Sequence, residues 1–237
     1  MNEPIPEPLD PELTTSSLVH ELRQPLFVLR GRLQLLRESG APLDGEALGE
    51  LLDQLDHMGS LLELYGRPPG EPVLAAPFDV RSGVDQALAL ISARANAAGV
   101  VIHADQPSGS VWINGHSAAL RQVLVNLLKN AIDAVSPARV REIVVRVTVH
   151  DARVEIAIED SGEGVPDEVR PRLFEPFVTS KPPGEGTGLG LFITRRHVEE
   201  LGGRVTIEPG DGGGAHARVV LPRVSDSPAG TPGSSGT

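Results

Sequence analysis

The sequence has no cysteine, which excludes disulfide bonds and thiolate metal sites. It is also poor in aromatic residues, which make up 3% of its 237 residues, so a core would be built mainly from Leu, Val, Ile and Ala. No apolar run approaches the roughly 20 residues that cross a bilayer. The first residues are acidic and proline-rich and lack the pattern of a secretory signal. We therefore expect no membrane insertion and a cytoplasmic location.

Positive charge is scarce as well. The formal net charge is −11, which argues against non-specific binding to nucleic acid or to an anionic membrane surface. An anionic ligand would therefore have to be met by locally placed positive groups. The seven histidines show no metal-ligand spacing. Hydrophobic residues nevertheless make up 40% of the chain, which is enough to bury a core.

Two segments near the start, 13–38 and 46–66, are expected to form helices separated by the turn-forming residues 39–45. Each carries apolar residues spaced alternately three and four apart, which is typical of a coiled-coil seam. Two such seams joined by a short turn predict an antiparallel hairpin. One hairpin cannot bury both seams, so we expect a homodimer in which two hairpins form a four-helix bundle. The seam residues are Val19, Leu22, Leu26, Leu29, Leu33 and Leu36, and then Leu48, Leu51, Leu55, Met58, Leu62 and Tyr65.

Beyond a linker-like stretch at 67–77, the pattern changes to strands mixed with helices. Several strands follow one another as hairpins, which predicts an α/β sandwich with helices on one face. The fold class expected for the whole chain is α+β. The expected elements are helices at 80–98, at 116–135 and from Gly188, and strands at 100–104, 111–113, 141–149, 153–159, 203–208 and 215–221. The expected domains are a disordered lead at 1–12, the hairpin at 13–66, the linker at 67–77, the sandwich at 78–222 and a disordered tail at 223–237.

His20 and Glu21 lie in the first helix at positions that should face solvent, if Val19 occupies heptad position a. A lone His-Glu pair is usually an ordinary polar pair on a helix surface. The pair could also be functional, because a carboxylate that binds one imidazole nitrogen leaves the other nucleophilic. Pro25, inside the helical pattern, is expected to bend the helix nearby.

The run from Leu18 to Leu26 resembles the H-box of bacterial sensor histidine kinases. The resemblance implies that His20 is phosphorylated, that Glu21 supports it as a base and that the hairpin dimerises. Gln24 matches the form found in the nitrogen-regulation and oxygen-sensing branch of the family. Many other members have Thr or Asn there, where it positions water for removal of the phosphoryl group from the partner. Because Gln24 departs from that form, phosphatase activity stays open, and a role in dephosphorylation or in contact with the partner is the expectation attached to Gln24.

Asn126 and Asn130 are four residues apart and share one face of the helix at 116–135. They could be two exposed amides, or their oxygens could serve a hard cation such as Mg²⁺. The stretch resembles the family's N-box, which implies that Asn130 binds Mg²⁺. Many members carry a basic residue where this chain has Asp133, so a phosphate contact would fall to Lys129 or Lys181.

The segment from Glu159 to Pro166 follows a strand and contains Asp160, Gly162 and Gly164. Read alone, it is a tight turn. Glycines also let the backbone approach a flat ring, and a carboxylate can accept the amino hydrogens of adenine. The segment resembles the G1 box of the family, in which the aspartate reads adenine.

Two further stretches complete the pattern. The segment 173–181 resembles the F-box, with Phe174 and Phe177 as an apolar anchor and Lys181 within reach of phosphates. The segment 184–193 runs from glycines into a helix, as in a flexible loop or a phosphate cradle at a helix N-terminus, and resembles the G2 box. Its candidate ATP-binding residues are Gly186, Thr187, Gly188, Leu189 and Gly190.

The resemblance covers residues 14–222 and implies a catalytic ATP-binding domain of the kind shared with gyrase, Hsp90 and MutL. It further implies that the chain uses Mg²⁺ and ATP to phosphorylate His20 and then passes the group to an aspartate of a response regulator. Ala215 departs from the polar residue common in the family and removes one contact near the base. The first 12 residues leave no room for a sensor domain, so an upstream input protein acting in trans is expected.

Two alternatives stay open at this point. One is a catalytically weak ATP-binding regulator or scaffold, which nucleotide binding without autophosphorylation would select. The other is a serine kinase or ATPase of the same superfamily, which acid-stable phosphorylation would favour.

Overall fold

The computed structural model describes residues 11–40, 45–66, 75–181, 186–210 and 212–224. The chain divides into two compact units, Met1–Glu71 and Pro72–Thr237. The predicted lead and tail lie outside the described residues, apart from 11–12 and 223–224, and so does most of the predicted linker.

The first unit is a helical hairpin of α1 (Pro11–Ser39) and α2 (Gly45–Gly66), which pack against each other. Helix α1 runs unbroken through the buried Pro25, and the bend predicted there stays a prediction. The seam positions divide into two sets. Leu22, Leu29 and Leu36 are half-buried and Leu51 is buried. The other set, spaced seven residues apart on each helix, is between 43% and 52% exposed and comprises Val19, Leu26, Leu33, Leu48, Leu55 and Leu62.

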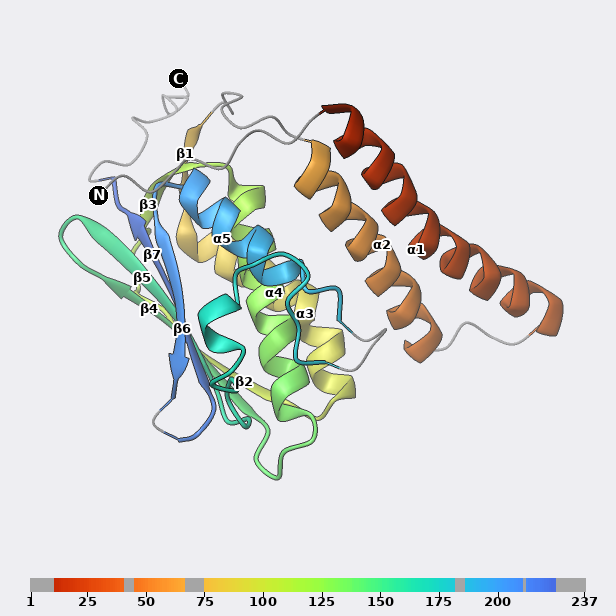
Figure 1. Cartoon of the computed structure of the whole chain (residues 1–237). Coiled ribbons are helices and arrows are strands. Elements are labelled where there is room, and N and C mark those ends of the chain that lie inside the picture. Colours follow the sequence, from red (N-terminus) through yellow and green to blue (C-terminus); the bar gives the residue numbers. More distant parts are fainter. Residues whose placement is uncertain (1–10, 41–44, 67–74, 182–185, 211, 225–237) are drawn as a thin grey trace, which may run out of the picture. The chain divides into compact units, whose positions relative to one another are not determined.

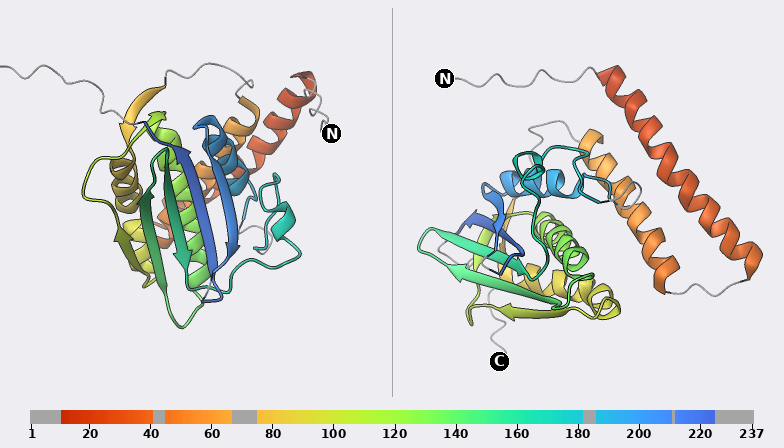
Figure 2. Two further views of the ribbon diagram at one scale, coloured as in Figure 1. Left: turned by 90° about the vertical axis from the view of Figure 1, so that its left-hand side faces the viewer. Right: turned by 60° about the horizontal axis from the view of Figure 1, so that its bottom comes forward.

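The second unit contains a five-stranded sheet with the strand order β2-β4-β5-β7-β6. Strand β2 is parallel to β4, and the other neighbours are antiparallel. Figure 1 and the left view of Figure 2 show helices α3, α4 and α5 gathered on one face of this sheet. The strands are β2 (Val101–Asp105), β4 (Glu142–Val149), β5 (Arg153–Asp160), β6 (Arg204–Pro209) and β7 (Ala215–Pro222), and the helices are α3 (Val80–Ala97), α4 (Ser117–Val135) and α5 (Gly190–Glu200).

The core lies between the helices and the sheet and is almost wholly aliphatic, as the low aromatic content predicts. Alternate residues of β4 and β5 point into it, as the period of two requires for a sheet covered on one face. Helix α4 turns an apolar stripe to the same core. The α/β sandwich with helices on one face is therefore confirmed. Core side chains that are essentially inaccessible include Ile91, Leu120, Leu124, Leu128, Ile132, Ile143, Ile156 and Leu221.

One strand was not predicted. Strand β1 (Ala76–Asp79) pairs antiparallel with β3 (Trp112–Gly115) in a separate two-stranded sheet. Pro77 made the segment read as linker, but an edge pairing tolerates a residue without an N–H group. The Asp79 carboxylate then accepts the N–H of Arg81 at 3.1 Å, which caps α3, and the N–H of Val111 at 3.0 Å.

Candidate functional site

His20, Glu21 and Gln24 all lie in α1, as predicted. Their side chains lie outside what the structure describes, so their solvent-facing orientation and their roles stay predictions. Two of their helix neighbours are described: Val19 is 52% exposed, and Pro25 is buried.

Helix α4 carries a polar stripe on the side opposite its core face. Asn126, Asn130 and Asp133 follow one another at spacings of four and three, so they share this stripe, and each is half-buried. The Asn126 amide donates to the carbonyl of Gly190 at 3.3 Å, which ties α4 to the first residue of α5. The Asn130 side chain makes no hydrogen bond to the residues that the structure describes, so its amide oxygen is available.

Asp160 ends β5 and organises the turn that follows. Its Oδ1 accepts the N–H groups of Gly162 at 2.9 Å and of Ala215 at 3.2 Å. Burial raises the pKa of Asp160 above its ordinary value, and these two backbone hydrogen bonds oppose the rise. Its Oδ2 accepts no hydrogen bond from the described residues. Burial of this carboxylate costs stability, and one of its oxygens remains open. Such a group is suited to accept a hydrogen bond from a ligand.

The backbone N–H of Ala215 makes a contact in the candidate site that the sequence interpretation missed. We expected Ala215 to remove a polar contact, yet its N–H supports the carboxylate of Asp160. Sequence offers no signal for such a bond, because every residue except proline has a backbone N–H group.

Glycines bring the Asp160 turn against neighbouring segments. A Cβ atom at Gly162 would lie 2.8 Å from the carbonyl oxygen of Ala134, so the turn approaches the end of α4 more closely than a side chain would allow. Gly164 lies beside the turn between β6 and β7, where a Cβ atom would be 2.8 Å from the carbonyl oxygen of Gly213. The turn is thus packed between α4 and the β6–β7 turn.

The segment after the 3₁₀ helix η1 (Arg170–Arg172) is only partly an apolar anchor. Leu173 is buried and Phe174 half-buried, but Phe177 is 50% exposed, so the anchor interpretation is wrong for Phe177. Phe177 has a φ of +65°, an unusual conformation for a bulky residue. A Cβ atom at Gly188 would collide with the Phe177 backbone, so only glycine permits this approach between the segment and the glycine-rich loop.

The Lys181 ammonium forms an ion pair with Oδ2 of Asp133. Oδ1 of the same carboxylate accepts from the Arg94 guanidinium at 2.8 Å. The structure therefore joins Lys181 to the polar stripe of α4 through an acidic residue that the sequence interpretation treated as a lost contact. Arg94 was missed altogether, because one arginine on the exposed side of a helix carries no signal.

The glycine-rich loop leads into α5, whose first residue contacts Asn126 of α4. The Thr187 hydroxyl accepts the N–H of Leu189 at 3.3 Å, and Leu189 is buried. Helix α5 begins at Gly190, two residues after the expected start. Its N-terminus presents unpaired N–H groups and the positive end of the helix dipole, which favour anions. Gly186 and Gly188 belong to this loop and pack against Lys181 and Phe177 respectively.

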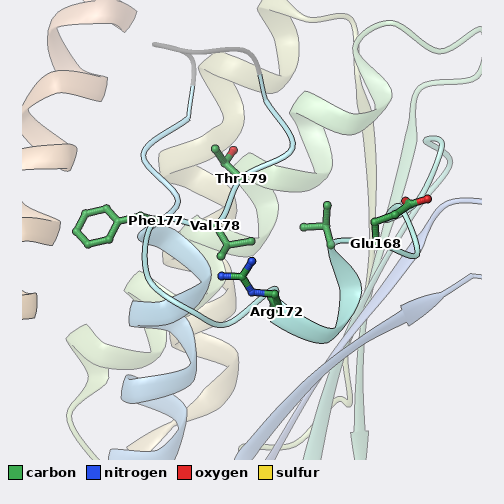
Figure 3. A pocket seen from close by; sticks show the side chains of 6 residues that line it. Glu168, Arg172, Phe177, Val178 and Thr179 are labelled. Carbon is green, nitrogen blue, oxygen red and sulfur yellow. The ribbon is translucent and has the colours of Figure 1, made fainter.

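A pocket of about 320 Å³ lies beside residues 168–179, around the 3₁₀ helix η1 and the segment after it (Figure 3). None of the predicted nucleotide-binding residues lines it, so we assign it no part in the site. Its lining consists of Glu168, Val169, Arg172, Phe177, Val178 and Thr179.

Three stretches far apart in sequence thus meet on α4. Asn126 contacts the start of α5, Ala134 meets the Asp160 turn, and Asp133 binds Lys181. Among the described residues, no group of three His, Asp or Glu side chains could hold a metal. A metal at this site would need amide and ligand oxygens, which suits Mg²⁺ and the open amide of Asn130.

Known sequence families match both units. Residues 12–64 match the His Kinase A (phospho-acceptor) domain, and residues 115–225 match the histidine kinase-, DNA gyrase B- and HSP90-like ATPase family. No helix in the described ranges has the length and apolarity that a membrane crossing requires.

Similar proteins include the two-component sensor PprA of Pseudomonas aeruginosa, which is 33% identical over 91% of this chain and 24% of the relative. The sensor protein FixL of Bradyrhizobium diazoefficiens is 31% identical over 90% of this chain and 43% of the relative. The chain therefore spans less than half the length of these relatives. The crystal structure of full-length ShkA in complex with AMPPNP has a TM-score of 0.66 at 26% identity, and covers 92% of this chain and 47% of that one.

Proposed function

Since this chain belongs to the family of two-component sensor histidine kinases, we propose that it is an ATP-dependent kinase that phosphorylates its own His20. The phosphoryl group then passes to an aspartate of a response regulator. We further propose that the protein acts as a homodimer in the cytoplasm.

The convergence on α4 carries the proposal. Asp160 offers an open carboxylate oxygen for the adenine amino group, and the start of α5 offers N–H groups for phosphates. Asn130 lies between these two features on the polar stripe of α4. Where Mg²⁺ is bound, it would offset negative charge on the phosphates, and the Asn130 oxygen would hold it.

The proposed reaction is an in-line phosphoryl transfer. A ring nitrogen of His20 forms a bond to the γ-phosphorus, the bond from that phosphorus to the β–γ bridging oxygen breaks, and ADP is released. Glu21 takes the proton that the imidazole loses, which keeps the attacking nitrogen nucleophilic. The phosphoryl group on nitrogen is then transferred to a carboxylate oxygen of the partner, which regenerates the imidazole.

The exposed half of each seam supports the homodimer. Apolar side chains seven residues apart on both helices form a stripe that one hairpin leaves about half exposed. A second hairpin would cover this stripe and complete a four-helix bundle. The surface around His20 would remain for the response regulator. Gln24, one turn beyond His20, is proposed to contact that partner or the water that dephosphorylates it.

The experiment that tests the function is transfer of radiolabel from γ-labelled ATP to the purified full chain. We expect label that is lost in acid and kept in base, as for phosphohistidine. His20→Gln should abolish the label. His103→Gln, which changes an exposed histidine on β2, should keep it.

Three results would count against the proposal. Label that persists in His20→Gln would show that another residue is phosphorylated. Acid-stable label would favour a serine kinase of the same superfamily. Nucleotide binding without any label would favour the catalytically weak regulator.

A further inference from the structure

The cluster of Arg94, Asp133 and Lys181 has no assigned role. It joins three segments: α3 supplies Arg94, α4 supplies Asp133, and the segment before the glycine-rich loop supplies Lys181. The side chains are 36%, 25% and 33% exposed respectively, so the three charges are partly withdrawn from water. Each oxygen of Asp133 takes one cation, which fixes the direction of the carboxylate.

The backbone and the aliphatic stem of Lys181 also contact neighbouring residues. Its backbone N–H donates to the Thr179 hydroxyl at 3.1 Å. A Cβ atom at Gly186 would lie 3.1 Å from Cβ and 3.2 Å from Cδ of Lys181, so the loop backbone packs along the lysine stem. The lysine stem therefore lies against the glycine-rich loop, and its ammonium binds Asp133 on the polar stripe of α4.

The cluster places a net positive charge next to the polar stripe of α4. Asp133 lies one helical turn beyond Asn130 on the polar stripe of α4. The two cations and one carboxylate of the cluster leave a net charge of +1 beside Asn130. A lysine ammonium has three N–H donors, and the bond to Asp133 leaves others for a second acceptor.

We propose that Asp133, oriented by Arg94, is a positioning residue that holds the Lys181 ammonium as the ligand of the terminal phosphate of ATP. The inference rests on the proposed function, because it assumes that a nucleotide binds at this site. It adds which residue distinguishes ATP from ADP, and it gives the acidic Asp133 a part in that distinction.

The test measures the equilibrium binding of ATP and ADP, with Mg²⁺ present, to the full chain carrying His20→Gln, so that ATP is not consumed by transfer to histidine. We expect Lys181→Met to weaken ATP about tenfold or more and to change ADP by less than about twofold, because only ATP has the terminal phosphate. Asp133→Asn should also reduce the preference for ATP. The double variant should be no worse than Lys181→Met alone, since both act through one ammonium.

Two matched variants sharpen the result. Lys129 and Lys181 are the only lysines in the chain, so Lys129→Met is a chemically identical change one turn before Asp133 and should alter the ATP:ADP ratio less. Asp133→Glu keeps the carboxylate and should retain part of the preference for ATP, whereas a role in folding alone would not move this ratio.

The opposing results are distinct. If Asp133→Asn strengthens ATP binding, Asp133 merely screens Lys181 and the inference is wrong. If Lys181→Met weakens the binding of ATP and of ADP equally, or weakens neither, Lys181 does not bind the terminal phosphate. If the parent protein binds neither nucleotide, the proposed function itself fails, which is a different outcome from a lost preference.

Discussion

The two units of this chain differ in how fully they bury their apolar side chains. The sheet and helices of Pro72–Thr237 enclose an aliphatic core, and the contacts of the candidate site are made within that unit. The hairpin of Met1–Glu71 leaves a stripe of apolar residues about half exposed. The difference indicates that the nucleotide-binding unit can be stable by itself, whereas the hairpin needs a second surface. In the proposed function, substrate binding and partner-dependent assembly are thus divided between the two units.

The largest expected effect is on the assembly of the hairpin. Leu26→Asp places a charge in the exposed stripe of each subunit, where a second hairpin would bury it. We expect the dimer dissociation constant to rise by about a hundredfold or more, as measured by analytical ultracentrifugation. Leu35→Asp changes an equally apolar residue that is 67% exposed and lies off the stripe, and it should leave the dimer intact. Equal disruption by both variants would refute the stripe as the interface.

An effect of similar free energy is expected from the core of the second unit. Ile156 lies on β5, the middle strand of the five-stranded sheet, and is inaccessible to solvent. Ile156→Ala should lower the free energy of unfolding by about 2–5 kcal/mol, measured by urea denaturation. Leu33→Ala, in the exposed stripe, should cost less than about 1 kcal/mol at concentrations where the hairpin is not paired. The comparison would fail if the two substitutions had similar costs under those conditions.

The smallest expected effect is at Asp160, where one substitution should weaken nucleotide binding and raise stability. Asp160→Asn should weaken ATP and ADP alike by about tenfold to a hundredfold, because the acceptor for the base loses its charge. The raised pKa means that the folded state disfavours the ionised carboxyl, so wild-type protein loses stability as pH rises through that pKa. The Asn variant should therefore melt at a higher temperature than wild type at neutral pH. This advantage should disappear in acid, where both side chains are neutral.

Melting curves of both proteins across this pH range check the sign. A variant less stable than wild type at neutral pH would show that the Asp160 carboxylate supports the fold rather than the ligand.

Much of the architecture could be predicted because it depends on local patterns. The spacing of the seams placed both helices of the hairpin. The expected strands at 141–149, 153–159, 203–208 and 215–221 agree closely with β4, β5, β6 and β7. Strand β1 was missed because only its pairing with β3, far along the chain, makes it a strand. Pairing of this kind leaves no periodic pattern in four residues.

The candidate site shows the same division. Asn126, Asn130, Asp160 and the glycines were found by their spacing and are brought together on α4. The Arg94–Asp133 bond joins residues 39 positions apart, and the Ala215 contact uses a backbone N–H, so neither could be predicted from local sequence. Sequence reasoning thus located the candidate ligand-binding residues, whereas the residues that hold them in place could be identified only from the structure.

The division between the units can be tested by mixing them as separate chains, 1–71 and 72–237, with Mg²⁺ and γ-labelled ATP. We expect acid-labile label on the 1–71 chain only when both chains are present. Either His20→Gln in the first chain or Asp160→Asn in the second should remove it. Label on the 72–237 chain itself would contradict the account, because the phosphorylated residue would then lie outside the hairpin.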